Sequence, residues 1–163
     1  MALLNIIKKG DDTLRKVCRP VEKITPRILT LLDDMRDTLI DSEGVGLAAP
    51  QIGILRRIAL VIDTNDNDKM YELINPEIIE REGEQEEMEG CLSVPGEWAV
   101  THRPMKVTVR AMDRDGNTFT VSGEGLTARC FCHEIDHLDG KLFIDEAVHV
   151  LTKEEIKELF DKE

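Results

Sequence analysis

The segment His133-Glu134-Ile135-Asp136-His137 is the most informative stretch of this sequence. On an α-helix, residues four positions apart lie on one face, so His133 and His137 present two imidazoles to one point. Glu134 lies one step round the helix and reaches a water held at that point. Two neutral imidazoles and a neighbouring carboxylate are the groups that metal-assisted hydrolysis requires. The segment therefore indicates a metal-dependent hydrolase.

The residues around this segment predict a buried helix over residues 126–138. Leu126, Cys130 and the two histidines fall on one face, and Gly140 suits the left-handed position that follows a helix C-terminus. The alternative is a chance match on a polar surface helix. Buried imidazoles need polar partners, and a metal ion supplies one, so the metal site is favoured.

Two further helices are expected. Thr25 is a suitable N-cap and Pro26 suits the first helical position, which predicts a helix over residues 26–42. Thr152 and Glu155 form a capping box for a short terminal helix over residues 152–160.

The strands expected from the sequence lie between these helices. A glycine-marked loop over residues 44–51 comes first. Alternating or apolar runs predict strands at residues 57–63, 71–75 and 105–112, and Asp115-Gly116 turns the last of these into a hairpin with residues 117–121. Because helices and strands do not alternate regularly, the expected class is α+β, with mostly antiparallel sheets.

Composition restricts the classes of function. A length of 163 residues suits one domain, residues 1–163, and the formal net charge of −12 argues against sequence-specific nucleic-acid binding and against anionic membranes. Seven glutamates lie between residues 77 and 90 and are expected on a solvated strand-and-turn face. The first residues lack the leader of a signal peptide, and no apolar run reaches membrane-spanning length. A cytoplasmic location is expected, with the four cysteines as thiols or metal ligands.

A catalytic metal site needs a third protein ligand. Phe143 occupies the position where one class of zinc protease carries a third histidine, so that class is disfavoured. Cys91, in Glu89-Gly90-Cys91-Leu92-Ser93, is the better candidate because a thiolate is a tight, soft ligand. Cys130 is a weaker one and is expected to line the pocket below the metal. The downstream acids of the terminal helix remain nominal alternatives, and these are Glu154, Glu155 and Glu158.

Three segments together resemble the signature motifs of the peptide deformylases, in the same order. They are Gly44-Val45-Gly46-Leu47-Ala48-Ala49-Pro50-Gln51, Glu89-Gly90-Cys91-Leu92-Ser93 and His133-Glu134-Ile135-Asp136-His137. The resemblance spans nearly the whole chain. It implies antiparallel sheets around a central helix that carries the third motif, and a metal held by Cys91, His133 and His137.

The resemblance also implies roles for other residues. Glu134 is implied as the general acid and base, with the Gln51 amide and the Leu92 backbone N–H stabilising the oxyanion. Substrate contacts are expected from Gly44, Val45, Gly46, Glu89, Gly90, Leu126 and Cys130, of which Val45, Leu126 and Cys130 are expected to form walls for the methionine side chain. An ion pair of Glu89 with Arg103 is expected behind Cys91, with two solvated surface charges as the alternative.

The implied reaction is removal of the formyl group from N-formylmethionyl peptides, with release of formate. The implied cofactor is one Fe²⁺ per chain, with Zn²⁺ or Ni²⁺ as substitutes, and a thiolate with two imidazoles suits these ions. A transient contact with the ribosome is expected, with no membrane partner. The sequence departs from the family at Cys132, which is expected to affect packing, and at Trp98, which is expected to affect preference beyond the methionine.

Overall fold

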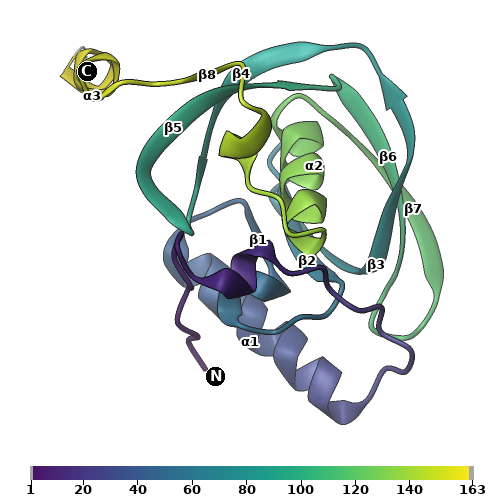
Figure 1. Cartoon of the computed structure of the whole chain (residues 1–163). Helices are drawn as coiled ribbons and strands as arrows, with labels where there is room; N and C mark the ends of the chain where they lie inside the picture. The colour runs from purple at the N-terminus through teal and green to yellow at the C-terminus, as the bar shows by residue number, and fades with distance from the viewer. Residues whose placement is uncertain (1, 162–163) are drawn as a thin grey trace.

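A single helix, α2 (Leu126–Leu138), lies at the centre of the molecule with β-sheet on both sides of it (Figure 1). The computed structural model describes residues 2–161, except for the side chain of Glu146. None of the helices in this described part is both long and apolar enough to cross a membrane.

Two antiparallel sheets surround α2, so the predicted α+β class with antiparallel sheets is confirmed. The larger sheet has the order β1-β2-β3-β6-β7 and the smaller has the order β4-β5-β8. The strands of the larger sheet are β1 (Gly46–Ala48), β2 (Ile58–Asp63), β3 (Lys69–Glu82), β6 (Lys106–Met112) and β7 (Thr118–Glu124). Those of the smaller sheet are β4 (Gln85–Cys91), β5 (Val94–Arg103) and β8 (His149–Val150).

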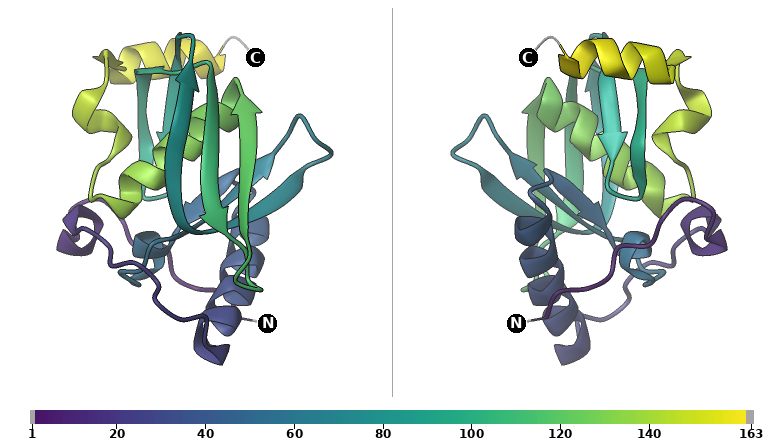
Figure 2. Two further views of the ribbon diagram at one scale, coloured as in Figure 1. Left: turned by 90° about the vertical axis from the view of Figure 1, so that its right-hand side faces the viewer. Right: turned by 90° about the vertical axis from the view of Figure 1, so that its left-hand side faces the viewer.

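The remaining elements lie outside this centre. Helix α1 (Pro26–Ser42) crosses beneath the larger sheet, and α3 (Lys153–Asp161) lies at the edge of the molecule beside the smaller one (Figure 2). Three short 3-10 helices connect the rest, namely η1 (Asp12–Arg15), η2 (Ala49–Ile52) and η3 (Phe143–Glu146).

Strand β2 of the larger sheet is covered on both faces, whereas β7 at the edge of this sheet is exposed on one of them. On one face Val61 packs with Phe131 and Ile135 of α2, and on the other Leu60 packs with residues of α1 such as Met35. Burial of both faces explains why β2 is an almost continuous apolar run instead of an alternating one. The core therefore holds α2 firmly on the strand that pairs with β1.

The predicted helices and their caps are confirmed. Thr25 Oγ1 accepts a hydrogen bond from the backbone N–H of Ile28 at 3.3 Å, and Pro26 is the first residue of α1. In the terminal helix, Thr152 N–H donates to Glu155 Oε1 at 3.0 Å and Glu155 N–H donates to Thr152 Oγ1 at 3.2 Å. Such caps depend on neighbouring residues alone, which is why sequence predicts them well.

The predicted end of a strand at residue 75 is wrong, because β3 continues to Glu82. Asn75 has a left-handed backbone (φ 52°) and the pairing register shifts between Ile74 and Glu77. The Asn75 side chain exchanges two hydrogen bonds with the backbone of Val21, at 2.8 and 2.9 Å. These bonds stabilise a bulge that sequence patterns interpret as a strand end.

Two other segments, residues 44–51 and β5, differ from the sequence predictions. The glycine-marked segment 44–51 is not only a loop, since it contains the short strand β1 and the 3-10 helix η2. Strand β5 was not predicted at all, although it pairs along most of β4. Gly96 and Pro95 near its start mask the pattern, because both residues are typical of turns.

Candidate metal centre

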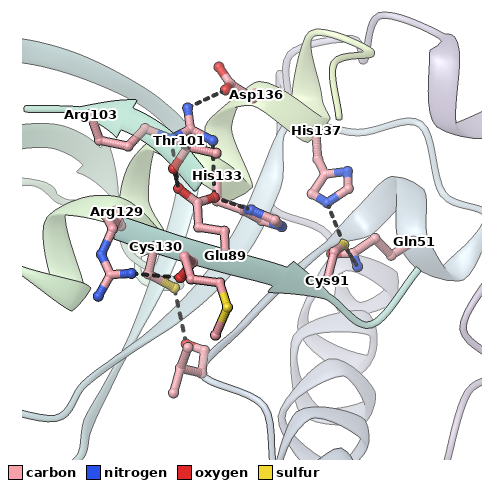
Figure 3. A network of polar contacts seen from close by, with 12 residues as sticks. Gln51, Glu89, Cys91, Thr101, Arg103, Arg129, Cys130, His133, Asp136 and His137 are labelled. Atoms are coloured by element: carbon pink, nitrogen blue, oxygen red, sulfur yellow. Dashed lines mark hydrogen bonds and ion pairs between the residues drawn. The ribbon is translucent and has the colours of Figure 1, made fainter. Parts of the chain in front are cut away.

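Cys91, His133 and His137 come together at one point between the smaller sheet and α2. Their ligand atoms all lie within 4.8 Å of one another, and Cys91 Sγ is 3.4 Å from His137 Nε2. Cys91 ends β4, whereas both histidines project from successive turns of α2. The three residues therefore converge because the sheet edge crosses the helix there, as Figure 3 shows.

The donor set fits a divalent metal ion. One thiol and two imidazoles are common ligands of Zn²⁺ and Fe²⁺, at about 2.0–2.3 Å from a tetrahedral ion. Burial lowers the pKa of His137 well below its usual value, which keeps that ring neutral and able to act as a ligand. At His133, burial also acts to lower the pKa, but Glu134, Cys91 and Glu89 outweigh it and raise the pKa well above the usual value. The groups around the His133 ring therefore favour a positive charge beside it.

The orientation of His133 is fixed by Glu89. His133 Nδ1 lies 2.9 Å from Glu89 Oε1, which leaves Nε2 free for the metal. Arg103 donates to both oxygens of the same carboxylate, at 3.0 and 3.2 Å, and Thr101 Oγ1 donates to Oε2 (Figure 3). Arg103 also donates to Asp136 Oδ2 at 2.7 Å, so the hydrogen-bond network connects β5 to a second residue of α2.

The expected pair of Glu89 and Arg103 thus exists, but not directly behind Cys91. The Glu89 carboxylate instead lies against His133. Both side chains are largely buried, with Glu89 7% and Arg103 12% exposed. Burial acts to raise the pKa of Glu89, but His133 and Arg103 outweigh it and lower the pKa to about 2. The carboxylate is therefore ionised and holds the imidazole in one tautomer.

Glu134 is buried beside the three candidate ligands. Burial, the largest effect, raises the pKa of Glu134 to about 7, although His133 acts to lower it. Within the described residues its Oε1 atom has no hydrogen-bond partner. A buried carboxylate with an unused oxygen and a pKa near neutrality is suited to exchange protons with a water or substrate.

Gly46 gives Glu134 its space. A Cβ atom at Gly46 would collide with Glu134 Oε2 and would lie 2.7 Å from Cys130 Sγ. Strand β1 therefore approaches α2 more closely than any residue with a side chain permits. Cys130 Sγ donates to Val45 O at 3.3 Å, which holds the same segment on the helix.

Gln51 faces the ligands from η2. Its Oε1 accepts from Ala48 N–H at 2.9 Å, and its Nε2 donates to Ser93 Oγ at 3.1 Å. The same Nε2 lies 3.7 Å from Cys91 Sγ. The amide is thus fixed in orientation, with a donor directed at the Cys91 sulfur.

A cavity of about 470 Å³ opens beside these groups. Every residue that is expected from the sequence to contact substrate lines this cavity. Its lining includes Gly44, Val45, Gly46, Gln51, Glu89, Gly90, Cys91, Leu92, Leu126, Cys130, His133 and Glu134. The sequence did not identify the further wall formed by Met88, Arg129 and residues 94–98, apart from Trp98. Sequence reasoning also missed Thr101, Ser93 and Asp136, since each is a common surface residue until its partner is known.

The remaining candidates lie elsewhere. Cys132 is buried in the apolar cluster of α2, as expected. Phe143 stacks on the His133 ring, with centroids 5.7 Å apart, so a third histidine is replaced by an apolar support. Glu155 is occupied by the cap of α3 and by His149 at 2.9 Å, and the other acids of that helix are exposed. The terminal helix therefore brings no ligand to the site.

Known proteins resemble this chain over nearly its whole length. The family model described as "Polypeptide deformylase" matches residues 3–153. A peptide deformylase of Caldicellulosiruptor bescii is 51% identical over 158 residues, which are 97% of this chain and 93% of that protein. One from Caldanaerobacter subterraneus is 52% identical over 157 residues, covering 96% and 97%.

Solved structures agree with these relatives. The crystal structure of a peptide deformylase from Legionella pneumophila superposes with a TM-score of 0.85 at 42% identity, covering 99% of each chain. A peptide deformylase from Synechococcus elongatus, solved in complex with actinonin, gives 0.84 at 34% identity, covering 98% of this chain and 85% of that one.

Proposed function

Because this chain belongs to the polypeptide deformylase family, we propose that Cys91, His133 and His137 hold the metal ion of its reaction. The chain is an enzyme, a metal-dependent hydrolase that removes the formyl group from formylated peptides. The observation that carries the proposed ligand set is the convergence of one sulfur and two imidazoles within 4.8 Å. We propose Fe²⁺ as the ion, with Zn²⁺ or Ni²⁺ as substitutes, since a thiolate with two imidazoles binds all three.

The reaction adds water across the formyl C–N bond. A bound divalent ion supplies a Lewis acid that acidifies water to a pKa of about 7. Glu134 accepts the proton that the attacking water loses, and it then delivers this proton to the nitrogen of the departing peptide. The C–N bond breaks, and the products are formate and a peptide with a free amino terminus. The pKa of about 7 for Glu134 suits both the acceptance and the delivery.

The formyl oxygen gains negative charge during the attack and needs donors that are already in place. Gln51 Nε2 has two N–H bonds, of which Ser93 Oγ accepts one at 3.1 Å. The other is directed at Cys91 Sγ at 3.7 Å, and we propose that the formyl oxygen accepts this N–H in place of the sulfur. The Leu92 backbone N–H is the proposed second donor.

The methionine side chain is proposed to lie in the cavity, against Val45, Leu126 and Cys130. Gly44, Gly46 and Gly90 line the same cavity and are proposed to contact the peptide backbone. Glu89 lines this cavity, but its carboxylate is occupied by His133 and Arg103, so we propose that it positions the metal ligand.

We propose that the chain forms a single catalytic domain and that it acts in the cytoplasm. Its expected partners are formylated peptides. A transient contact with the ribosome remains a proposal, to which residues 153–157 are a candidate contributor.

The test is formate release from formyl-Met-Ala-Ser by anaerobically prepared, Fe²⁺-loaded protein. Cys91→Ala is expected to lose both metal and turnover, whereas Cys18→Ala, in a separate buried cluster, is expected to keep both. Metal content by mass spectrometry accompanies each assay. Retention of metal and turnover by Cys91→Ala contradicts the proposed ligand set.

A further inference from the structure

The Trp98 ring is held between β4 and the terminal helix α3. On one side it packs so closely on Gly90 that a Cβ atom there would lie 2.5 Å from the ring. On the other side it contacts Phe160 of α3, with ring centroids 5.9 Å apart and planes tilted by 57°. Trp98 therefore links α3 to the residue that directly precedes the proposed ligand Cys91.

The terminal segment is attached to the same part of β5. Leu151 N–H donates to Trp98 O at 2.9 Å, and Val148 N–H donates to Val100 O at 2.8 Å. Helix α3 itself has no buried residue in its described part, and Phe160 remains 48% exposed. Helix α3 lies at the edge of the molecule (Figure 1), and Trp98 contacts it through Phe160 and holds Leu151, which precedes the helix, through the Trp98 carbonyl oxygen.

Trp98 lines the outer wall of the cavity. His133 and Glu134, at the inner end, are buried, whereas Pro95 and Gly96 of the Trp98 wall are exposed. A peptide whose formyl group reaches Glu134 must leave the cavity toward solvent. The exposed Pro95 and Gly96 make this wall one place where the residues that follow the methionine reach solvent.

We propose that Trp98 determines specificity for the residues after the methionine, and that Phe160 is a positioning residue that fixes the Trp98 ring. The inference rests on the proposed function and adds a preference to it. An indole offers a broad apolar face, so aromatic side chains after the methionine are favoured over small polar ones. The terminal helix thereby contributes to substrate choice without contacting the substrate.

Kinetics of three substrates test this assignment. Formyl-methioninamide has no following residue, formyl-Met-Ala-Ser has small polar ones, and formyl-Met-Phe-Phe has aromatic ones. Phe160→Ala is expected to raise KM for formyl-Met-Phe-Phe by about two- to tenfold, the range for an aromatic contact, with kcat unchanged. KM for formyl-methioninamide is expected to stay constant. Leu159→Ala, which alters the adjacent exposed apolar residue, is the matched control and is expected to behave like the parent.

A double-mutant cycle separates positioning from a general effect. Trp98→Leu is expected to raise KM for formyl-Met-Phe-Phe, and adding Phe160→Ala in that background is expected to change nothing further. Equal changes for all three substrates, or additive effects of the two substitutions, overturn the proposal. If the parent enzyme releases no formate from formyl-methioninamide, the proposed function fails instead.

Fluorescence supplies a readout that does not depend on turnover, because Trp98 is the single tryptophan of the sequence. Phe160→Ala is expected to shift the emission of the free protein, and titration with formyl-Met-Phe-Phe is expected to change it more than titration with formyl-methioninamide. An emission that responds identically to both compounds contradicts a contact with the following residues.

Discussion

Replacing Gly46 by alanine tests whether β1 sets the position of Glu134. Gly46 does not have a positive φ, so the backbone accepts alanine without conformational strain. The new Cβ atom would instead lie 2.7 Å from Cys130 Sγ and 2.9 Å from Glu134 Cδ, with a still closer approach to Glu134 Oε2. Ordinary carbon contacts are about 3.5–4.0 Å, so the carboxylate must move by about 1 Å.

The size of the effect follows from this displacement. Overpacking of a core costs about 1–3 kcal/mol, which leaves a protein of ordinary stability folded. The loss of Tm is then expected to be about 2–12 °C. A misplacement of about 1 Å costs about 100-fold in rate, and general acid–base catalysis contributes about 10²–10⁴-fold. We therefore expect kcat to fall by about 100-fold while the metal content stays at the parent value.

Gly123→Ala is the matched control. Its Cβ would also collide with α2, at 2.5 Å from Thr127 Cγ2 and 2.8 Å from Phe131 Cε2, but away from Glu134. It is expected to lower Tm by a similar amount and to keep kcat. In a Glu134→Gln background, Gly46→Ala is expected to cause little further loss, because the displaced group no longer acts. An unchanged kcat in Gly46→Ala, or an equal loss in Gly123→Ala, refutes the reasoning.

Two further substitutions test the network behind the site and the end of α2. Glu89, with a pKa lowered from 4.5 to about 2, contributes stability that is complete above pH 4.5 and is lost as the pH falls through 2. In metal-free protein, Glu89→Gln is therefore expected to have a free energy of unfolding about 3 kcal/mol lower than the parent at pH 7. Urea unfolding should show this difference in stability narrowing between about pH 4.5 and pH 2. A difference that does not depend on pH contradicts the ion pair. Gly140 has φ 76° and a Cβ there would lie 2.5 Å from Arg15 O, so Gly140→Ala is expected to lower stability by about 2–4 kcal/mol and to keep kcat at 25 °C. Gly116 has φ 83°, and a Cβ there would meet only Ile24 Cδ1 at an ordinary 3.9 Å. Gly116→Ala therefore measures the cost of the left-handed backbone alone and is expected to lower stability by only about 1–2 kcal/mol in thermal unfolding. An equal loss of stability from both substitutions contradicts a role for the Arg15 contact.

Sequence patterns predict those parts of the fold that depend on neighbouring residues. The bounds of α1 and α2 agree with prediction because Thr25, Pro26 and the spacing of His133 and His137 act within single helical turns. The hairpin of β6 and β7 also follows from one local turn at Gly116, whose φ is 83°. These features need no knowledge of distant partners.

Strands β4 and β5 escaped prediction in part because their polar residues are paired across the fold. The glutamates of residues 77–90 are mostly solvated, as expected, but Glu89 is buried against His133, 44 positions away in the chain. Arg103 pairs with it from the end of β5. A pattern method counts both residues as surface charges, since hydropathy carries no information about such distant pairs.

The same long-range pairing explains why the sequence identifies the candidate ligands but not the residues that hold them in position. A metal ligand is recognised by its residue type and spacing, because an ion accepts few kinds of side chain. Its supporting partners are ordinary residues such as Thr101 and Asp136, which act only through the geometry that brings β4, β5 and α2 together. Those partners fix the tautomer of His133, so the smaller sheet positions one proposed metal ligand and also forms a wall of the cavity. Substitutions in β5 are therefore expected to affect metal affinity even where they leave the three ligands untouched.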